Sequence, residues 1–466
     1  MPHRKTQHGE ALQTPLAVEF LIIGGGIAGL ATAIALRRVG HHLLTDVGQV
    51  SGGVRLCPIM NGILNSWGLG PKLAEVSLKS EYVTVLQYHS GEIFGKHHWE
   101  HELVEEAGGS FIVMHYADFH ALLTQHALSL GAQIRYNAHV IEVDIENAPE
   151  GKEASVVLPC GEVLHADVVI GADGPFSIVR NTILDGKCPN RGIPMGLLLW
   201  NTTVSLQKMR ADPDLAWFVD QPPTLFQHFG DTHAVISYPV GGKEEFAMHI
   251  YTPDDGSLDD RGSWKKQVPV TNLQKAMGAC EPRLMKLASF AAPPSCLKVF
   301  ETTDLEDWVH DEAPLLLVGE AAHSIPAGST SATSTALEDA VCLAELFCHL
   351  HHKDQTTMLL DAFQEIRQPR CKSVHAFESY NLRYMSMPAG PEQEARDAAM
   401  KLAYDQGKGA LDGDEAYGEV LQMFAYDPED AASDWWVQWG LLNERSKGRD
   451  VGYDIDVIIA EAEVSE

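Results

Sequence analysis

The chain has 466 residues, 45% of them hydrophobic and 21% charged, which is typical of a globular protein and excludes a largely disordered one. Chains longer than roughly 250–300 residues usually form two packed domains or one large α/β unit, so a small binding module is also excluded. The formal net charge of -30 would repel nucleic-acid phosphates and anionic lipids, and we expect neither as a partner.

Eight cysteines occur without a CxxC pair or the spacing of a small disulfide-rich domain, which favours reduced thiols. They stand at positions 57, 160, 188, 280, 296, 342, 348 and 371. The chain has no HExxH pattern, so we expect no metal, and no GxSxG pattern of a hydrolase. The N-terminal residues lack the apolar region of a signal peptide, and glycines interrupt the first apolar run. These features predict a cytoplasmic protein with no membrane span.

The first elements alternate between strands and helices. Residues 18–23 form a buried strand pattern, and residues 24–40 turn at glycines and continue with helical spacing. Residues 41–46 predict a short second strand, and residues 52–69 lead through another glycine turn into a helix. Residues 117–174 then predict a helix, a strand beginning near Ile134 and a hairpin.

The pattern changes in the second half of the chain. Residues 195–251 alternate in short segments separated by Pro and Gly, which predicts an antiparallel sheet. Residues 313–323 predict a further apolar strand and turn, and residues 334–350 have the spacing of a long helix. The remaining chain favours helices, including the Trp-rich segment 427–440, which we expect to pack on the outside of the domain.

Gly24, Gly26 and Gly29 form a GxGxxG pattern between the first strand and the first helix. In that context the glycines allow backbone N–H groups to approach a pyrophosphate, although such a triplet can also be a purely structural turn. An acidic residue that binds an adenosine ribose is expected about 20 residues further on, where Asp46 is the candidate. The pattern therefore predicts a dinucleotide site.

Two later segments carry a resemblance to a known family. The segment GADGPFSIVR, residues 171–180, resembles the DGxxSxVR motif of flavoprotein monooxygenases of the salicylate and p-hydroxybenzoate hydroxylase type (group A). The segment LLLVGEAAHSIPAGSTSATSTALEDA, residues 315–340, resembles the second flavin motif of the family. The resemblance extends over residues 17–375. It implies that Asp173 lies near the flavin and that Arg180 holds the loop.

The resemblance implies an α/β fold with a Rossmann-like FAD-binding domain of the GR2 type, a stacked and mainly antiparallel substrate-binding sheet, and a C-terminal helical segment. The expected divisions are a tail (1–16), the FAD-binding lobe (17–185 and 296–375), the sheet layer (186–295) and the C-terminal region (376–466). The implied activity is monooxygenation: FAD, reduced by NAD(P)H, reacts with dioxygen, and one oxygen atom is transferred to an aromatic or other electron-rich small molecule. Such enzymes commonly serve secondary-metabolite biosynthesis.

Several positions depart from the pattern of the family. Tyr116 replaces an Arg expected near the FAD phosphates, Glu320 replaces an Asp, and Asn201 stands where relatives often carry a substrate-orienting Arg. Residues 330–332 read Thr-Ser-Ala in place of GQG, and residues 40–53 are about four residues short. These departures leave two alternatives open: a flavin-independent cyclase or isomerase on the same scaffold, or a non-catalytic ligand-binding relative.

The sequence therefore gives two sets of candidate site residues. The expected cofactor-binding residues are Gly24, Gly26, Gly29, Asp46, Gly53, Tyr116, Asp173, Arg180, Glu320 and Thr333. The expected substrate pocket lies between the sheet and the FAD lobe, and its candidate residues are Asn201, Phe226, Tyr238, His323 and Pro326. His323 could also transfer a proton near neutral pH, since its unperturbed pKa lies there.

Overall fold

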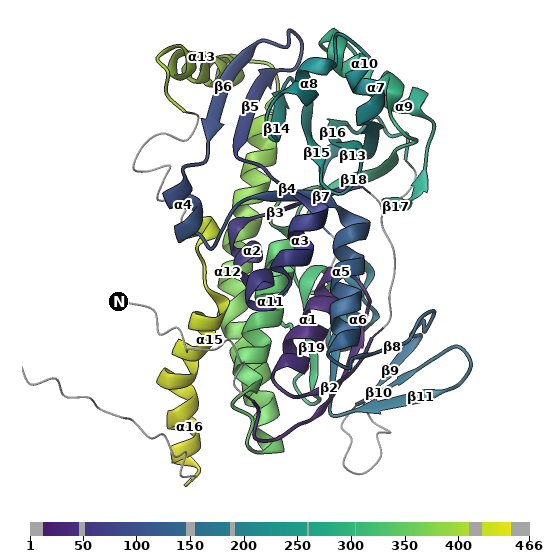
Figure 1. The fold of residues 1–466 in the computed structure, drawn as a ribbon. Helices are drawn as coiled ribbons and strands as arrows, with labels where there is room; N and C mark the ends of the chain where they lie inside the picture. Colours follow the sequence, from purple (N-terminus) through teal and green to yellow (C-terminus); the bar gives the residue numbers. More distant parts are fainter. Residues whose placement is uncertain are drawn as a thin grey trace, which may run out of the picture.

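A five-stranded parallel sheet organises the lower half of the molecule in the computed structural model (Figure 1), which describes residues 13–45, 52–145, 154–186, 192–258, 261–302, 304–409 and 422–448. The strand order is β19, β12, β1, β2, β8. Their bounds are Leu315–Leu317, Val168–Gly171, Glu19–Ile23, His42–Thr45 and Gln133–Ile134. Three of these strands, β1, β12 and β19, are apolar runs because helices cover parallel sheets on both faces. This sheet confirms the predicted α/β lobe.

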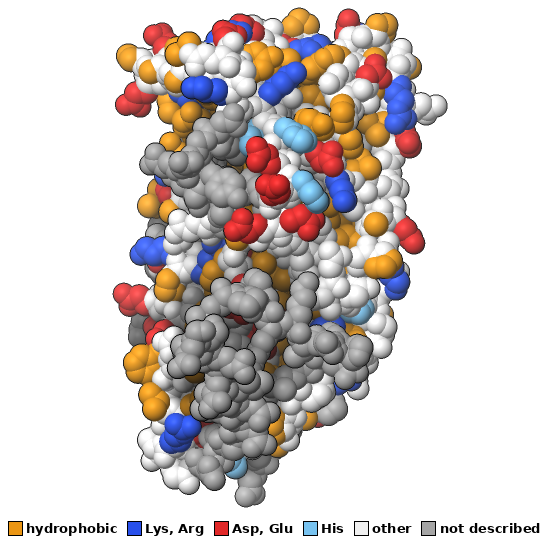
Figure 2. Space-filling view, turned by 60° about the vertical axis from the view of Figure 1, so that its left-hand side comes forward, with side chains coloured by type: hydrophobic (Ala, Val, Ile, Leu, Met, Phe, Trp, Pro, Cys, Tyr) orange, Lys and Arg blue, Asp and Glu red, His pale blue; other side chains and the backbone are white. Residues whose placement is uncertain are grey.

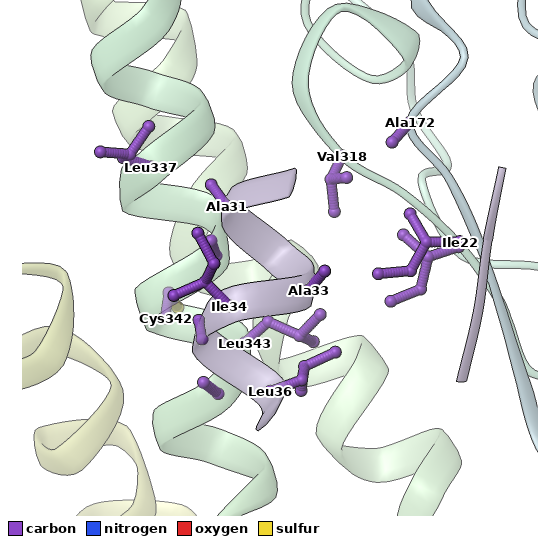
Figure 3. Packing of buried hydrophobic residues seen from close by; sticks show 14 of the residues in the cluster. Ile22, Ala31, Ala33, Ile34, Leu36, Ala172, Val318, Leu337, Cys342 and Leu343 are labelled. Atoms are coloured by element: carbon purple, nitrogen blue, oxygen red, sulfur yellow. The ribbon is translucent and has the colours of Figure 1, made fainter. Parts of the chain in front are cut away.

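Three helices pack around this sheet. They are α1 (Ile27–Arg38), α5 (Tyr116–Ser129) and α11 (Ala332–Phe347). Figure 3 shows Ile34 of α1 beside Cys342 of α11, with Ile22 of β1 on the sheet side. Small side chains such as Ala31 let α1 and α11 approach closely, so the two segments that flank the predicted flavin site are held together by one core.

Smaller elements connect the lobe to the rest of the fold. The predicted hairpin forms a three-stranded antiparallel sheet of β9 (Glu142–Asp144), β10 (Ala154–Val157) and β11 (Val163–Ala166). A second small sheet joins β3 (Gly53–Leu56), β7 (Ile112–His115) and β4 (Ser77–Lys79). The connecting helices are α2 (Pro58–Ser66), α3 (Gly70–Val76), α4 (His101–Glu106) and α6 (Ile178–Ile183).

An eight-stranded sheet forms the upper layer, in the order β17, β18, β13, β16, β15, β14, β5, β6. The bounds in that order are Gly262–Gln267, Ser295–Glu301, Ile193–Ser205, Glu245–Pro253, Ala234–Val240, Thr224–Phe229, Tyr82–Gln87 and Ile93–His98. All neighbours are antiparallel except β14 and β5. The predicted antiparallel sheet is confirmed, but β5 and β6 come from the segment assigned to the FAD lobe, and β18 continues past residue 295.

The two faces of this sheet have different neighbours. Alternate residues such as Leu198 and Ile250 form a cluster on the outer face with helices α7 to α10. Those helices span Leu206–Arg210, Ala216–Asp220, Val270–Met277 and Pro282–Phe290. Leu199 and Tyr251 belong to the cluster on the opposite, inner face. Because side chains alternate between the two faces of a strand, each strand contributes one set of residues to the outer core and the other set to the inner face.

The helix α12 (Thr356–Met385) runs along both layers (Figure 1) and crosses the expected boundary at residue 375. After it, α13 (Pro391–Asp405) packs on β6, and α15 (Pro428–Trp435) packs on α11. Trp436, in the π-helical turn before α16 (Leu441–Ser446), is buried and stacks on His349 at 4.4 Å between ring centroids. The Trp-rich segment thus packs outside the lobe, as predicted.

The surface reflects the acidic composition. Figure 2 shows acidic and His side chains gathered on one face. The helix α4 carries His101 with Glu102, Glu105 and Glu106. Among the described residues, no helix is both long and apolar enough to cross a membrane.

Candidate functional site

The glycine turn after β1 has the geometry of a diphosphate site. Gly24 has a φ of +112°, and a Cβ atom there would lie 2.2 Å from the carbonyl oxygen of Ala172. A Cβ atom at Gly29 would lie 2.0 Å from the carbonyl oxygen of Gly24, so both positions require glycine. At Gly26, the N-cap of α1, an added Cβ would meet nothing within 4 Å, and the first turn of α1 carries no acid. The free N–H groups of the helix therefore face open space that suits an anion.

The helix α5 fixes this turn from one side. The Nε2 atom of His120 donates a hydrogen bond to the carbonyl oxygen of Gly25 at 2.8 Å. Tyr116, the first residue of α5, stacks over the His120 ring with centroids 6.3 Å apart. His120 was missed in the sequence, where the only signal was its place in the segment HYADFH. The segment thus holds the glycine turn through His120 and presents Tyr116 where an Arg was expected.

The two other predicted flavin segments meet at the same place. The Nη1 atom of Arg180 donates to the carbonyl oxygen of Ala321 at 2.9 Å, and its Nη2 atom donates to the carbonyl oxygen of Pro175. Gly319 has a φ of +59°, and a Cβ atom there would lie 2.6 Å from the Cβ of Ala28 on α1. Arg180 therefore ties the GADG segment to the GEAAH turn, and that turn packs on the first turn of α1.

Two carboxyl groups lie in this region. The Oδ2 atom of Asp173 accepts a hydrogen bond from the N–H of Ile178 at 2.7 Å, while its buried Oδ1 atom has no partner. Burial raises the pKa of Asp173. Desolvation by the surrounding protein also raises the pKa of Glu320, although part of this residue is exposed to solvent. Burial, with a contribution from Glu320, raises the pKa of Tyr116. These surroundings therefore favour the protonated form of each group more than water does.

His323 belongs to a buried ionic network. Its Nε2 atom donates to Oδ2 of Asp339 at 2.6 Å, and the same oxygen accepts from the N–H of Gly319 at 2.9 Å. The Nε atom of Arg367 donates to Oδ1 of Asp339 at 2.9 Å, and its Nη2 atom donates to Glu338 at 2.9 Å. Burial alone would raise the pKa of Asp339, but His323 and Arg367 lower it to about 2. His323 therefore holds the GEAAH turn against α11 and α12.

A large cavity lies between the inner face of the eight-stranded sheet, α12 and the turn at residues 328–330. Its volume is about 1070 Å³, at the upper end of the range of roughly 300–1,000 Å³ found for small-molecule sites. Its wall is mostly apolar, and its aromatic residues include Trp99, Phe111, Phe229, Tyr251, Phe377, Tyr380, Tyr384, Phe424 and Tyr426. Among its polar residues are Arg55, His97, Gln227, Arg370, Glu378 and Asn381. The cavity can therefore hold a large ring system and offers a few polar contacts.

The five predicted pocket residues do not line this cavity. Phe226 packs with Phe218 on the outer face, whereas its neighbours Leu225 and Gln227 line the cavity. The prediction that Phe226 lines the pocket was wrong, because consecutive strand residues point to opposite faces of a sheet. Its placement required knowing which face was covered by α7 to α10.

The other pocket candidates lie near the cavity but around its edges. Tyr238 and Asn201 lie beside the glycine pair Gly52 and Gly53 at the start of β3. An added Cβ at Gly53 would lie 2.8 Å from the Oη atom of Tyr238. Asn201 is similarly close to Gly52. The carbonyl oxygen of Pro326 accepts from the N–H of Ser329, which forms the turn that borders the cavity.

The remaining cofactor candidates have different placements. Thr333 lies in the first turn of α11, where its Oγ1 atom contacts the Sδ atom of Met60 at 3.7 Å. Asp46 lies outside the described residues. The predicted glycine turn, the GADG segment and the GEAAH turn are thus brought together, and Gly53 lies at the sheet side of the same region.

The sequence profile of the family described as FAD binding domain matches residues 17–378 of the chain. The chain belongs to this family. The match covers most of the chain and includes all three glycine-containing segments that meet at the N-terminus of α1. It confirms the predicted FAD-binding fold and, together with the relatives below, the predicted group A monooxygenase type.

Curated relatives of this FAD-binding chain are named as monooxygenases. FAD-dependent monooxygenase OpS4 of Beauveria bassiana (strain ARSEF 2860) is 28% identical over 399 residues, 84% of this chain and 90% of that protein. 3-Hydroxybenzoate 6-hydroxylase of Klebsiella oxytoca is 24% identical over 398 residues, 82% and 92% of the two chains.

Solved structures show the same fold. The crystal structure of CtdE in complex with FAD and substrate 4 aligns with a TM-score of 0.74 at 19% identity, over 92% of this chain and all of that chain. A salicylate hydroxylase substrate complex aligns with a TM-score of 0.69 at 20% identity, over 90% and 97% of the two chains. These similarities extend through the eight-stranded sheet as well as the dinucleotide lobe.

Proposed function

We propose that this chain is a FAD-dependent, NAD(P)H-using monooxygenase that hydroxylates or epoxidises an aromatic or other electron-rich small molecule in secondary-metabolite biosynthesis. The observation that carries the proposal is the convergence of three flavin segments at the N-terminus of α1, next to a large aromatic-lined cavity. The name of the Beauveria relative supports the same activity. Dioxygen is the proposed second substrate.

The residues at the glycine turn fit FAD. The N–H groups at Gly26 and the start of α1 would hold the diphosphate, because no side chain caps this end of the helix and an added Cβ at Gly26 meets nothing within 4 Å. The unpaired Oδ1 atom of Asp173 is an acceptor suited to a sugar hydroxyl. Gly53 and Thr333 would approach the flavin side of the cofactor. When bound, FAD supplies the electron transfer from NAD(P)H and the reaction with dioxygen.

The chain itself supplies orientation and exclusion of water. The aromatic wall of the cavity, including Trp99 and Phe377, would hold a planar substrate by stacking and edge contacts. The turn at residues 328–330 closes the end of the cavity that faces α11. Exclusion of water by the apolar wall of the cavity would limit side reactions of reactive intermediates with solvent.

We further infer a cytoplasmic location. The supporting observation is that the cysteines in the described part of the chain are free thiols, four of which lie in the core of the FAD lobe.

The proposal is tested by the absorption spectrum of the purified protein and by titration with FAD. We expect visible flavin bands, and NAD(P)H oxidation that requires dioxygen. A colourless protein without measurable FAD affinity would contradict the proposal. Turnover of a substrate without dioxygen and NAD(P)H would instead support the flavin-independent cyclase or isomerase.

A variant pair sharpens the titration. Gly26 has room for a side chain and an ordinary φ of -74°, so Gly26→Ala and Gly26→Asp should both fold. Asp is a good N-cap residue but places a negative charge against the diphosphate. We expect Gly26→Asp to weaken FAD binding at least tenfold more than Gly26→Ala, measured by quenching of FAD fluorescence. Equal affinities of the two variants for FAD would show that the diphosphate does not bind at this turn.

A further inference from the structure

Arg55 is a buried cation at the inner end of the cavity. It lies on β3, is 6% exposed and lines the cavity beside the turn at residues 328–330. Its Nη2 atom donates to the carbonyl oxygen of Gly328. Its Nη1 atom is buried and has no hydrogen-bond partner. Among the ion pairs of the described residues, none includes Arg55. The guanidinium is therefore held in place on one side and unpaired on the other.

A guanidinium in this position favours an anion. Arg remains protonated in proteins, so burial cannot be relieved by loss of a proton. The ring of Tyr238 also lies near the cation, with its centroid 5.8 Å from the Cζ atom. A buried charge is strongly disfavoured unless it is paired and hydrogen-bonded. The missing partner is thus expected to be a negatively charged group that enters through the cavity.

Two neighbouring side chains add neutral hydrogen-bonding groups. The Oη atom of Tyr238 is buried without a partner, and burial, opposed by Arg55, raises the pKa of Tyr238 to about 12. Burial and Arg55 lower the pKa of His249 to about 3, and its Nδ1 atom is also unpaired. Both side chains are neutral at pH 7, and a phenol is a donor while a neutral imidazole offers one donor nitrogen. They therefore leave the positive charge of Arg55 without a counterion.

The other charged side chains of the cavity are already engaged. Arg370 forms an ion pair with Glu338, with 3.1 Å between Nη2 and Oε1. The Oε1 atom of Glu378 accepts from the N–H of Ser331 at 2.8 Å, which directs this carboxylate to the turn before α11. Arg55 is consequently the cation of the cavity wall that remains available to a ligand.

We propose that Arg55 binds a negatively charged oxygen of the substrate and is the residue that selects anionic aromatic substrates. This inference rests on the proposed function, because it assigns the cavity to the substrate of the monooxygenase. The anionic oxygen would lie at the inner end of the cavity, and the ring system would extend along the aromatic wall.

The test compares two probes of the same shape, 3-hydroxy-2-naphthoate and its neutral amide, 3-hydroxy-2-naphthamide. Calorimetric titration of the full-length protein, with and without saturating FAD, gives the dissociation constant of each probe. We expect the wild type to bind the carboxylate at least tenfold more tightly than the amide. Arg55→Met should lose this preference, and Arg55→Lys should keep part of it, since the charge remains without the fork of donors.

Arg210→Met is the matched control, because it removes an exposed arginine that pairs with Glu244 far from the cavity. It should leave the preference unchanged. Equal affinity of the wild type for both probes, or no binding of the carboxylate at 1 mM, would overturn the inference without any variant.

A separate FAD titration distinguishes the source of the anion. If Arg55→Met weakens FAD binding tenfold and keeps the carboxylate preference, Arg55 serves the cofactor and the inference fails. If the wild type binds no FAD, the proposed function fails, while the probe preference still reports on Arg55.

Discussion

The Asp339→Asn variant tests whether the buried ionic network holds the flavin segments together. Asp339 is fully buried and accepts three hydrogen bonds, from Gly319, His323 and Arg367. An asparagine has the same shape but only one acceptor oxygen, so its NH2 group must face at least one of these donors. The substitution also removes one of the two carboxylates, Asp339 and Glu338, that pair with the buried Arg367, and it removes the ion-pair partner of His323.

The expected loss of stability is large. Removing one partner from a buried ion pair costs roughly 3–5 kcal/mol, against a total stability of about 5–15 kcal/mol for a typical protein. With a denaturant dependence of about 2–3 kcal/mol per M urea, the unfolding midpoint should fall by about 1–2 M. Because Gly319 begins the GEAAH turn, FAD affinity should fall as well.

The assay is urea unfolding followed by circular dichroism, with Asp304→Asn as the control. Asp304 pairs with Lys372 of α12, but these side chains are 59% and 72% exposed. An exposed pair contributes about 0–1 kcal/mol, so the control midpoint should barely move. If Asp339→Asn shifts the midpoint no more than Asp304→Asn does, the network does not stabilise the fold in the way described.

Two further predictions concern the same region. Tyr116→Arg should strengthen FAD binding about 10- to 150-fold, since a hydrogen bond to a charged group contributes about 1.5–3 kcal/mol; fluorescence titration beside Tyr116→Phe measures this, and equal affinities would place residue 116 away from the phosphates. Burial opposes protonation of His323, but Asp339 and Cys371 raise its pKa well above 6.5, so its contribution to stability is complete below pH 6.5 and is lost as pH rises through the folded pKa. Wild-type stability should therefore fall more between pH 6.5 and 9 than that of His323→Gln in thermal unfolding, and parallel profiles would contradict the assignment.

The local sequence pattern was sufficient to predict the elements of the dinucleotide lobe. The strands at residues 18–23 and 314–317 are apolar because the parallel sheet is covered on both faces, and the glycines follow directly. The upper sheet was only partly predictable. Its strand β5 pairs with β14, far away in sequence, and β6 pairs with β5. No periodicity within residues 82–98 shows the pairing with β14. Long-range pairing is decided by tertiary packing.

The polar residues of the site differ in how much local signal they carry. The glycines and Arg180 lie in segments whose residue spacing has a physical reason, so they could be predicted. Arg55 is a single Arg in a short strand, and only the burial of its side chain beside Gly328 distinguishes it. His120 was equally hidden, because a helical His becomes informative only when the carbonyl oxygen of Gly25 is found beside it.

The departures from the family pattern change the charge of the cofactor site more than its shape. The turn at Gly24 is fixed by close backbone packing on Ala172 and by His120, neither of which depends on residue 116. Without the expected Arg, the repulsion between the diphosphate and the two nearby carboxyl groups must be reduced in another way. Burial raises the pKa of both Asp173 and Glu320, which lowers the cost of protonating them. The backbone N–H groups at the start of α1 remain the donors for the diphosphate, and the shape of the site is consistent with retained FAD.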